Sequence, residues 1–151
     1  MKDYAKMAQE YFNSGYNCSQ SVLLAFCDKA GLDEKTALMI SSSFGGGMGR
    51  LREVCGAVSG MFMVIGLLYG YSDTADHAAK SAHYSRLQTL AKSFSDETGS
   101  IICRDLLGLG KGADNPVPEK RTEQYYKKRP CGEIVYIAAK ITQEYIENNA
   151  N

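Results

Sequence analysis

The chain has no excess of charge of either sign, because its 151 residues include 17 acidic and 17 basic side chains and the net charge is +0. Proteins that bind nucleic acid usually carry a basic patch or a basic balance, so we expect no nucleic-acid partner. Long hydrophobic runs are missing as well. The most apolar stretch, residues 57–71, is shorter than the roughly 20 residues that cross a bilayer, so we expect no membrane span.

Alternation of apolar and polar residues over a useful length is absent, and so is any internal repeat. Apolar residues instead recur at helical spacing between glycine-rich turns. The length suits one hydrophobic core. We therefore predict an all-α fold, a compact single-domain helical bundle over residues 1–151 with about six to seven helices.

Capping residues and glycines set the expected limits of these helices. The apolar, glycine-rich helix that follows the glycine run at 45–49 is expected to lie in the centre of the bundle. Residues 108–118 form the one clear loop. The expected helices cover approximately residues 3–13, 17–29, 33–40, 52–69, 74–97, 100–107 and the segment from 130 onward.

None of the five cysteines belongs to a Cys-x-x-Cys pair. We also expect no secretion signal. The first residues contain no apolar core of the signal-peptide kind, so we expect a cytoplasmic protein. In a reducing compartment, cysteines are more often metal-binding or catalytic than structural disulfides. A site shared by these thiols would have to be assembled by the fold from distant segments.

Four of the five cysteines are expected at helix starts, where free N–H groups and the helix dipole lower the pKa of a thiol. Asn17 and Pro130 each stand immediately before one of them, and Ser100 stands shortly before a third. The fourth follows the glycine run. We take these four as candidate catalytic, cofactor-binding and metal-ligating residues: Cys18, Cys55, Cys103 and Cys131.

Cys27 is expected to differ from the other four. It lies nine residues after Cys18 on the same predicted helix, which is about two and a half turns, so the two face opposite ways. Its apolar neighbours indicate a small core residue.

Several neighbouring residues bear on the candidate site. Gly56 and Gly60 are one turn apart, which would let another backbone approach the helix start at Cys55. Arg50 and Arg52 are candidates to lower the pKa of Cys55, and the basic run at 127–129 to stabilise a thiolate at Cys131. The run at 45–49 is expected to be a tight turn, with an anion-binding loop as the alternative. His83, on an apolar stripe, is expected to be a core histidine.

Four thiolates allow several kinds of chemistry. They can hold a [2Fe–2S] or [4Fe–4S] cluster, bind zinc, or act as dithiol/disulfide pairs. We expect a small redox protein that transfers electrons through an iron–sulfur cluster or by disulfide exchange, with a redox partner that the sequence does not identify. One alternative is a non-catalytic zinc-binding or sensing module, and another is a helical interaction protein with inert thiols. Its glycine-rich apolar helices also permit a homodimer.

The motif residues resemble a known family, the redox-active proteins labelled C_GCAxxG_C_C. The matching residues are Cys18, Cys55-Gly56-Ala57-x-x-Gly60, Cys103 and Cys131, and Cys27 falls outside the pattern. The resemblance implies redox activity at the four cysteines, with Gly56 at the cofactor. The family is also similar to a segment of split-Soret cytochromes, which implies an iron–sulfur cluster. The haem part does not carry over, because the chain contains no Cys-x-x-Cys-His.

Overall fold

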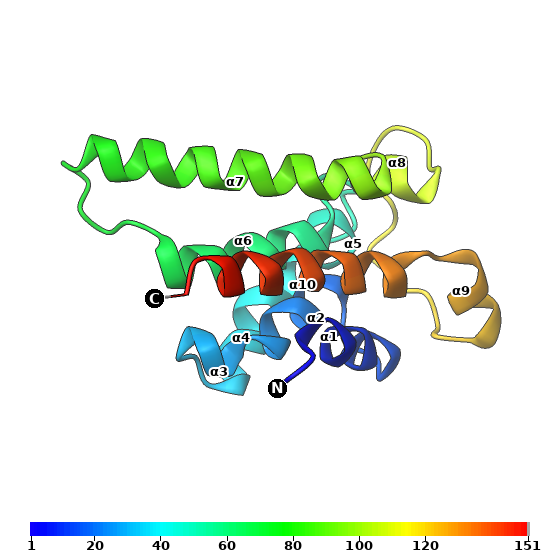
Figure 1. Ribbon diagram of the computed structural model, residues 1–151. Helices are drawn as coiled ribbons and strands as arrows, with labels where there is room; N and C mark the ends of the chain where they lie inside the picture. Colours follow the sequence, from blue (N-terminus) through cyan, green and yellow to red (C-terminus); the bar gives the residue numbers. More distant parts are fainter. Residues whose placement is uncertain (151) are drawn as a thin grey trace.

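A computed structural model describes residues 1–150, and within this range the chain is all helix and turn, with no β-strand (Figure 1). This confirms the predicted all-α fold. The helices are α1 (Tyr4–Asn13), α2 (Cys18–Ala25), α3 (Cys27–Ala30), α4 (Glu34–Ser41), a 3₁₀ turn η1 (Ser42–Phe44), α5 (Gly45–Met48), α6 (Gly56–Tyr69), α7 (His77–Thr98), α8 (Cys103–Leu107), α9 (Glu123–Lys128) and α10 (Cys131–Asn148). Six of them are eight residues or longer, close to the expected number.

The glycine-rich helix α6 lies in the centre, as predicted. Its residues from Gly56 to Met61 are all buried, and α2, α7 and α10 pack around it. Gly60 allows α2 to approach closely, because a Cβ atom there would lie 2.9 Å from the carbonyl oxygen of Ser19 on α2. Small residues on α6 thus let the start of α2 approach the start of α6.

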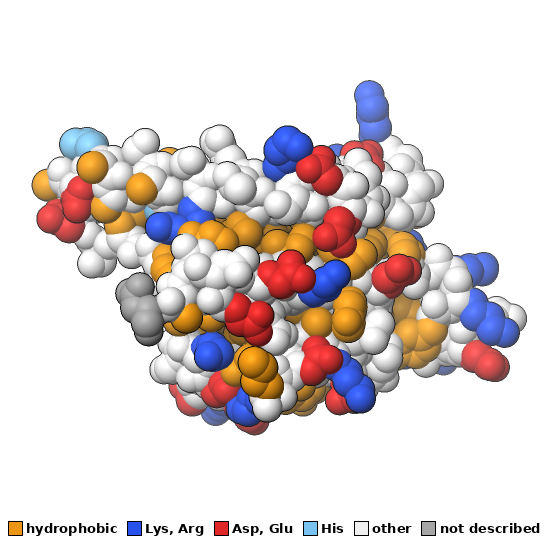
Figure 2. All heavy atoms as spheres, viewed as in Figure 1, with side chains coloured by type: hydrophobic (Ala, Val, Ile, Leu, Met, Phe, Trp, Pro, Cys, Tyr) orange, Lys and Arg blue, Asp and Glu red, His pale blue; other side chains and the backbone are white. Residues whose placement is uncertain are grey.

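Helix α7 lies along one side of the bundle and is joined to α6 by an extended connection (Figure 1). Only His83, Leu90 and Phe94 of its predicted apolar stripe are buried, so the helix covers the core along a narrow line. Figure 2 shows hydrophobic side chains at the seam between α7 and α10, and mixed acidic and basic side chains over the rest of that face. His83 is the expected core histidine, with Arg86 3.0 Å from its Nδ1.

Four predicted helix limits were wrong, and one of them is that of the helix expected over 100–107, which begins at Cys103. The helix expected over 17–29 breaks at Phe26, whose ψ of 8° separates α2 from α3, so Cys27 begins a helix and is half-buried against the core. The helix expected from Arg52 begins at Gly56, because Arg52 has a φ of 60°. The helix expected from residue 73 or 74 begins at His77, because Asp76 provides the cap by accepting from the Ala79 N–H.

Helix α9 was not predicted, and it lies between the loop after α8 and the last helix. Thr122 caps it by accepting from the backbone N–H of Tyr125. In Figure 1, α5, α8 and α9 gather at the end of the molecule where α6 and α10 begin. None of the helices in residues 1–150 combines the length and apolarity that crossing a membrane requires.

Candidate functional site

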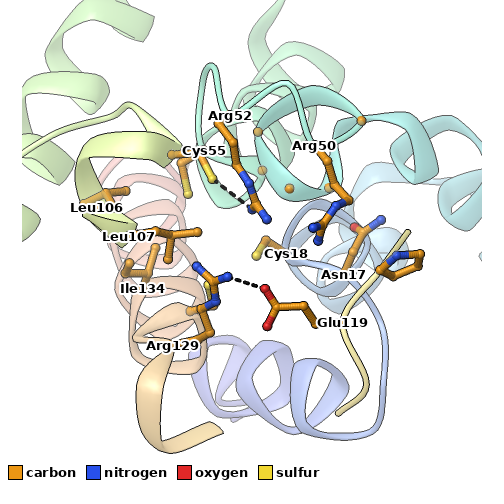
Figure 3. Close-up of a pocket in the computed structure, with 18 of the residues that line it drawn as sticks. Asn17, Cys18, Arg50, Arg52, Cys55, Leu106, Leu107, Glu119, Arg129 and Ile134 are labelled. Atoms are coloured by element: carbon orange, nitrogen blue, oxygen red, sulfur yellow. Dashed lines mark hydrogen bonds and ion pairs between the residues drawn. The ribbon is translucent and has the colours of Figure 1, made fainter. Parts of the chain in front are cut away.

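The four candidate cysteines line one cavity of about 280 Å³, and Cys27 is not among its lining residues. The cavity lies where α2, α6, α8 and α10 begin. In Figure 3, Cys18 and Cys55 face the same space, into which Arg50, Arg52 and Arg129 also project. The fold therefore brings together the four thiols that the sequence singled out, from segments spread over residues 18–131.

All four cysteines lie at helix starts, as predicted, although two occupy other cap positions than expected. Cys18 follows Asn17, whose side chain accepts from the Gln20 N–H in a capping box, and Cys55 is itself the N-cap of α6. Cys103 is the first residue of α8 rather than about the third, because the Ser100 hydroxyl accepts from the Ile102 N–H and caps no helix. Cys131 is the first residue of α10 rather than the second, because Pro130 is the N-cap.

A pair of backbone hydrogen bonds places Cys55 beside Cys103. An isolated antiparallel bridge joins Val54 to Ile102. On one side of it the Cys55 N–H donates to the Ile101 carbonyl at 2.8 Å, and on the other the Cys103 N–H donates to the Glu53 carbonyl at 2.6 Å. These two thiols are thus held by the backbone that precedes their helices.

Glycines make room for the other contacts around the thiols. A Cβ atom at Gly47 would lie 2.6 Å from Cβ of Cys103, and one at Gly56 would lie 3.1 Å from Cβ of Cys18. Gly45, Gly46, Gly47 and Gly49 also line the cavity. The glycine run was expected to be a tight turn before Cys55, and the cysteine that its Gly47 approaches is Cys103.

Burial reverses the expected lowering of the pKa at Cys55 and Cys103. The pKa of Cys55 rises to about 12 because the side chain is buried, although the backbone N–H groups of Ala57 and Val58 act in the opposite direction. Burial also raises the pKa of Cys103, against the attraction of Arg52. At Cys55 the N–H groups of the helix start do favour the thiolate, but desolvation of the charged form outweighs them.

Cys18 and Cys131 behave as a pair. A hydrogen bond between the two thiols, together with burial, raises the pKa of Cys18. The same hydrogen bond lowers the pKa of Cys131, helped by the charges of Arg129, Arg121 and Arg52. When this pair loses its first proton, the thiolate therefore forms at Cys131 and the proton stays on Cys18.

Arginines compensate negative charge around the cavity. Nη1 of Arg52 lies 3.6 Å from Sγ of Cys103. Arg52 was expected to act on Cys55, but the thiol that it contacts is Cys103. Of the basic run at 127–129, only Arg129 lines the cavity, where it pairs with Glu119 (Figure 3), and the two lysines are exposed.

No pattern in the sequence indicated several of the residues that line or support the cavity. Arg121 stacks on the Phe12 ring, 4.3 Å from its centroid, and donates to the Phe12 and Tyr16 carbonyls. Asp114 accepts from Arg52, and Tyr125 lies against Arg121. Arg121 and Asp114 belong to the loop after α8 and Tyr125 belongs to α9. In these segments the apolar periodicity is too weak to reveal contacts.

The cavity is larger than a single ion requires. Within residues 1–150, no three or more His, Cys, Asp or Glu side chains are grouped so that they could hold one metal ion. A volume of about 280 Å³ is several times the share of one water molecule, roughly 30 Å³, and admits a group of several atoms. Soft thiolate ligands are the donors that iron–sulfur clusters use.

Comparison with known proteins agrees with the cysteine pattern. A family model described as "Putative redox-active protein (C_GCAxxG_C_C)" matches residues 16–145. This range contains all the cavity-lining residues except Phe12. A search of curated proteins found no match, and a search of solved structures found none.

Proposed function

Since the chain belongs to the C_GCAxxG_C_C family of redox-active proteins, we propose that it is an electron carrier whose Cys18, Cys55, Cys103 and Cys131 hold an iron–sulfur cluster. One observation carries the proposal, namely that these four thiols, and not Cys27, line a single cavity. A carrier of this kind exchanges electrons with partner redox proteins.

The surroundings of the thiols support this function. When bound, a cluster would supply reversible one-electron chemistry. Cys55 and Cys103 are only 5% and 7% exposed, so their sulfurs are shielded from water and from other thiols. Arg52, Arg121 and Arg129 offset the negative charge that four thiolates would bring together. Gly56 leaves the space beside Cys18 open, in keeping with a place at the cofactor.

Anaerobic purification followed by elemental analysis and an absorption spectrum tests the proposal. We expect iron and acid-labile sulfide in the protein and a broad visible band that dithionite bleaches. A colourless protein that stays free of iron after incubation with iron and sulfide would contradict it. Zinc in place of iron, with chelator-induced unfolding, would favour the zinc-binding module instead.

Disulfide exchange is a second candidate, favoured by the interaction between the Cys18 and Cys131 thiols, which raises the pKa of Cys18 and lowers that of Cys131. The Cys131 thiolate would attack a substrate disulfide, releasing one substrate thiolate and forming a mixed disulfide. Cys18, giving up its proton, would then displace the second substrate thiolate. The products are a Cys18–Cys131 disulfide and two substrate sulfurs, one protonated by the proton from Cys18 and the other released as a thiolate that takes its proton from water, a two-electron reduction of the substrate.

We expect selective alkylation of Cys131 over Cys27 in the metal-free protein. The lowered pKa of Cys131 means that its thiolate forms at a lower pH than that of Cys27, whose pKa burial raises. Iodoacetamide should therefore label Cys131 before Cys27 as the pH is increased from 6 to 10, as followed by peptide mass spectrometry. Labelling of both residues over the same pH range would contradict the disulfide-exchange candidate.

The cytoplasm is the proposed location, in agreement with the sequence-based expectation. A protein that works with reduced thiols is suited to a compartment that glutathione and thioredoxin keep reducing. All five cysteines of the chain are free thiols.

A further inference from the structure

The segment between the glycine run and Cys55 has an unusual backbone. Met48, Arg50 and Arg52 have φ values of 68°, 65° and 60°, the left-handed region that residues with a side chain rarely adopt. Such conformations cost free energy and persist only where surrounding contacts hold them. Their concentration within five residues, at the edge of the cysteine cavity, calls for a compensating interaction.

The side chain of Arg52 contributes such an interaction, alongside the backbone hydrogen bonds that the Arg52 and Glu53 N–H groups donate to the Gly46 and Gly47 carbonyls. It is 5% exposed, and its Nη1 lies 3.6 Å from Sγ of Cys103. Its Nε and Nη2 both donate to Oδ2 of Asp114, at 3.3 and 3.0 Å. The guanidinium is therefore held between a carboxylate on the loop after α8 and one cysteine sulfur.

Arg50 provides a natural comparison. It has nearly the same φ, and its Nη2 lies 3.2 Å from the same Asp114 oxygen. Its Nε, however, donates to the carbonyl of Asn115 at 2.6 Å, and none of its hydrogen bonds reaches a cysteine sulfur. Both arginines thus bind Asp114, but only Arg52 donates a hydrogen bond to a cysteine sulfur.

We propose that Arg52 is a positioning residue that sets the reduction potential of the site through its hydrogen bond to Cys103, with Asp114 holding it in place. This inference rests on the proposed function. Reduction adds one negative charge to the site, and a cationic donor at a ligand sulfur stabilises the reduced form, which raises the potential.

The test compares Arg52→Gln and Arg50→Gln in the cluster-loaded protein by dithionite titration under an inert atmosphere. Arg52→Gln should weaken the reduced form roughly tenfold relative to the oxidised form, a shift of about 59 mV to lower potential for one electron. Arg50→Gln should shift the potential much less, because it loosens the same loop without losing a bond to sulfur. Equal shifts in the two variants, or no shift in Arg52→Gln, would overturn the proposal.

A second variant tests the proposal if the Arg52→Gln protein does not fold. Arg52→Gly removes the same side chain but suits the φ of 60°, so it should fold and show the same lowered potential. An unchanged potential in a folded Arg52→Gly protein would also overturn the proposal.

If the proposed function is wrong, the unsubstituted protein contains no iron. This result differs from every result that would overturn the role of Arg52. The Arg52 contact is then tested in the metal-free protein by the alkylation rate of Cys103 at pH 9, referenced to Cys27 in the same molecule. Cys103 should react at least about threefold more slowly in Arg52→Gln than in Arg50→Gln, because only the former loses the cation that favours the thiolate. Equal rates would contradict the contact.

Discussion

Serine in place of any one of the four cavity cysteines is expected to reduce the bound iron and sulfide to below about a tenth of the unsubstituted level. Each substitution removes a soft thiolate and leaves a hydroxyl, a much poorer ligand for iron in a cluster. The loss should be similar at all four positions, because each thiol comes from a different helix start and no neighbouring cysteine can replace it. Iron and sulfide analysis of the purified variants measures the effect.

Cys27→Ser is the matched control. Cys27 begins α3, is half-buried against the hydrophobic core and lies outside the cavity lining. The variant should therefore keep its iron, its sulfide and its visible band. A Cys27→Ser protein that loses the cofactor as completely as the others would disprove the assignment of the site to the four remaining cysteines.

Gly60→Ala should destabilise the protein by about 1–3 kcal/mol, because it inserts a methyl group into a closely packed contact. The added Cβ atom would lie 2.9 Å from both the Ser19 carbonyl oxygen and Cβ of Val22, so α2 would have to move away from α6. Since Cys18 begins α2, this movement should also lower cofactor content. Thermal unfolding should show a drop in Tm of at least about 2 °C.

Gly66→Ala offers the control on the same helix. No atom lies within 4 Å of the position of an added Cβ atom there, so the substitution gains helix propensity without a clash. It should raise stability by about 0.5–1 kcal/mol. If both variants lowered stability equally, the contact between α2 and α6 at Gly60 would not be the cause.

Local sequence signals were enough to predict the helix starts at Cys18 and Cys131. The Asn17 and Gln20 side chains form the capping box that their spacing indicates, and Pro130 precedes α10 because it cannot continue a preceding helix. The central place of α6 also follows from composition, since a helix that is apolar on all sides has to be buried.

The electrostatics of the site could not be predicted in the same way. Whether a thiol at a helix start has a lowered pKa depends on how deeply the fold buries it, and that depth is decided by distant segments such as the loop carrying Asp114. The contact of Arg52 with Cys103 required a positive φ at a non-glycine residue, for which sequence patterns give no warning.

The short bridge between Val54 and Ile102 bears on the order in which the protein matures. It ties the start of α6 to the start of α8, but Cys131 joins the other thiols only when α10 docks against α1, α2 and α6. A nascent chain therefore exposes an incomplete set of ligands until its last long helix is in place. A cofactor held by all four thiols could then be inserted only after α10 has been made and has docked, so its presence would report that folding has proceeded as far as this helix.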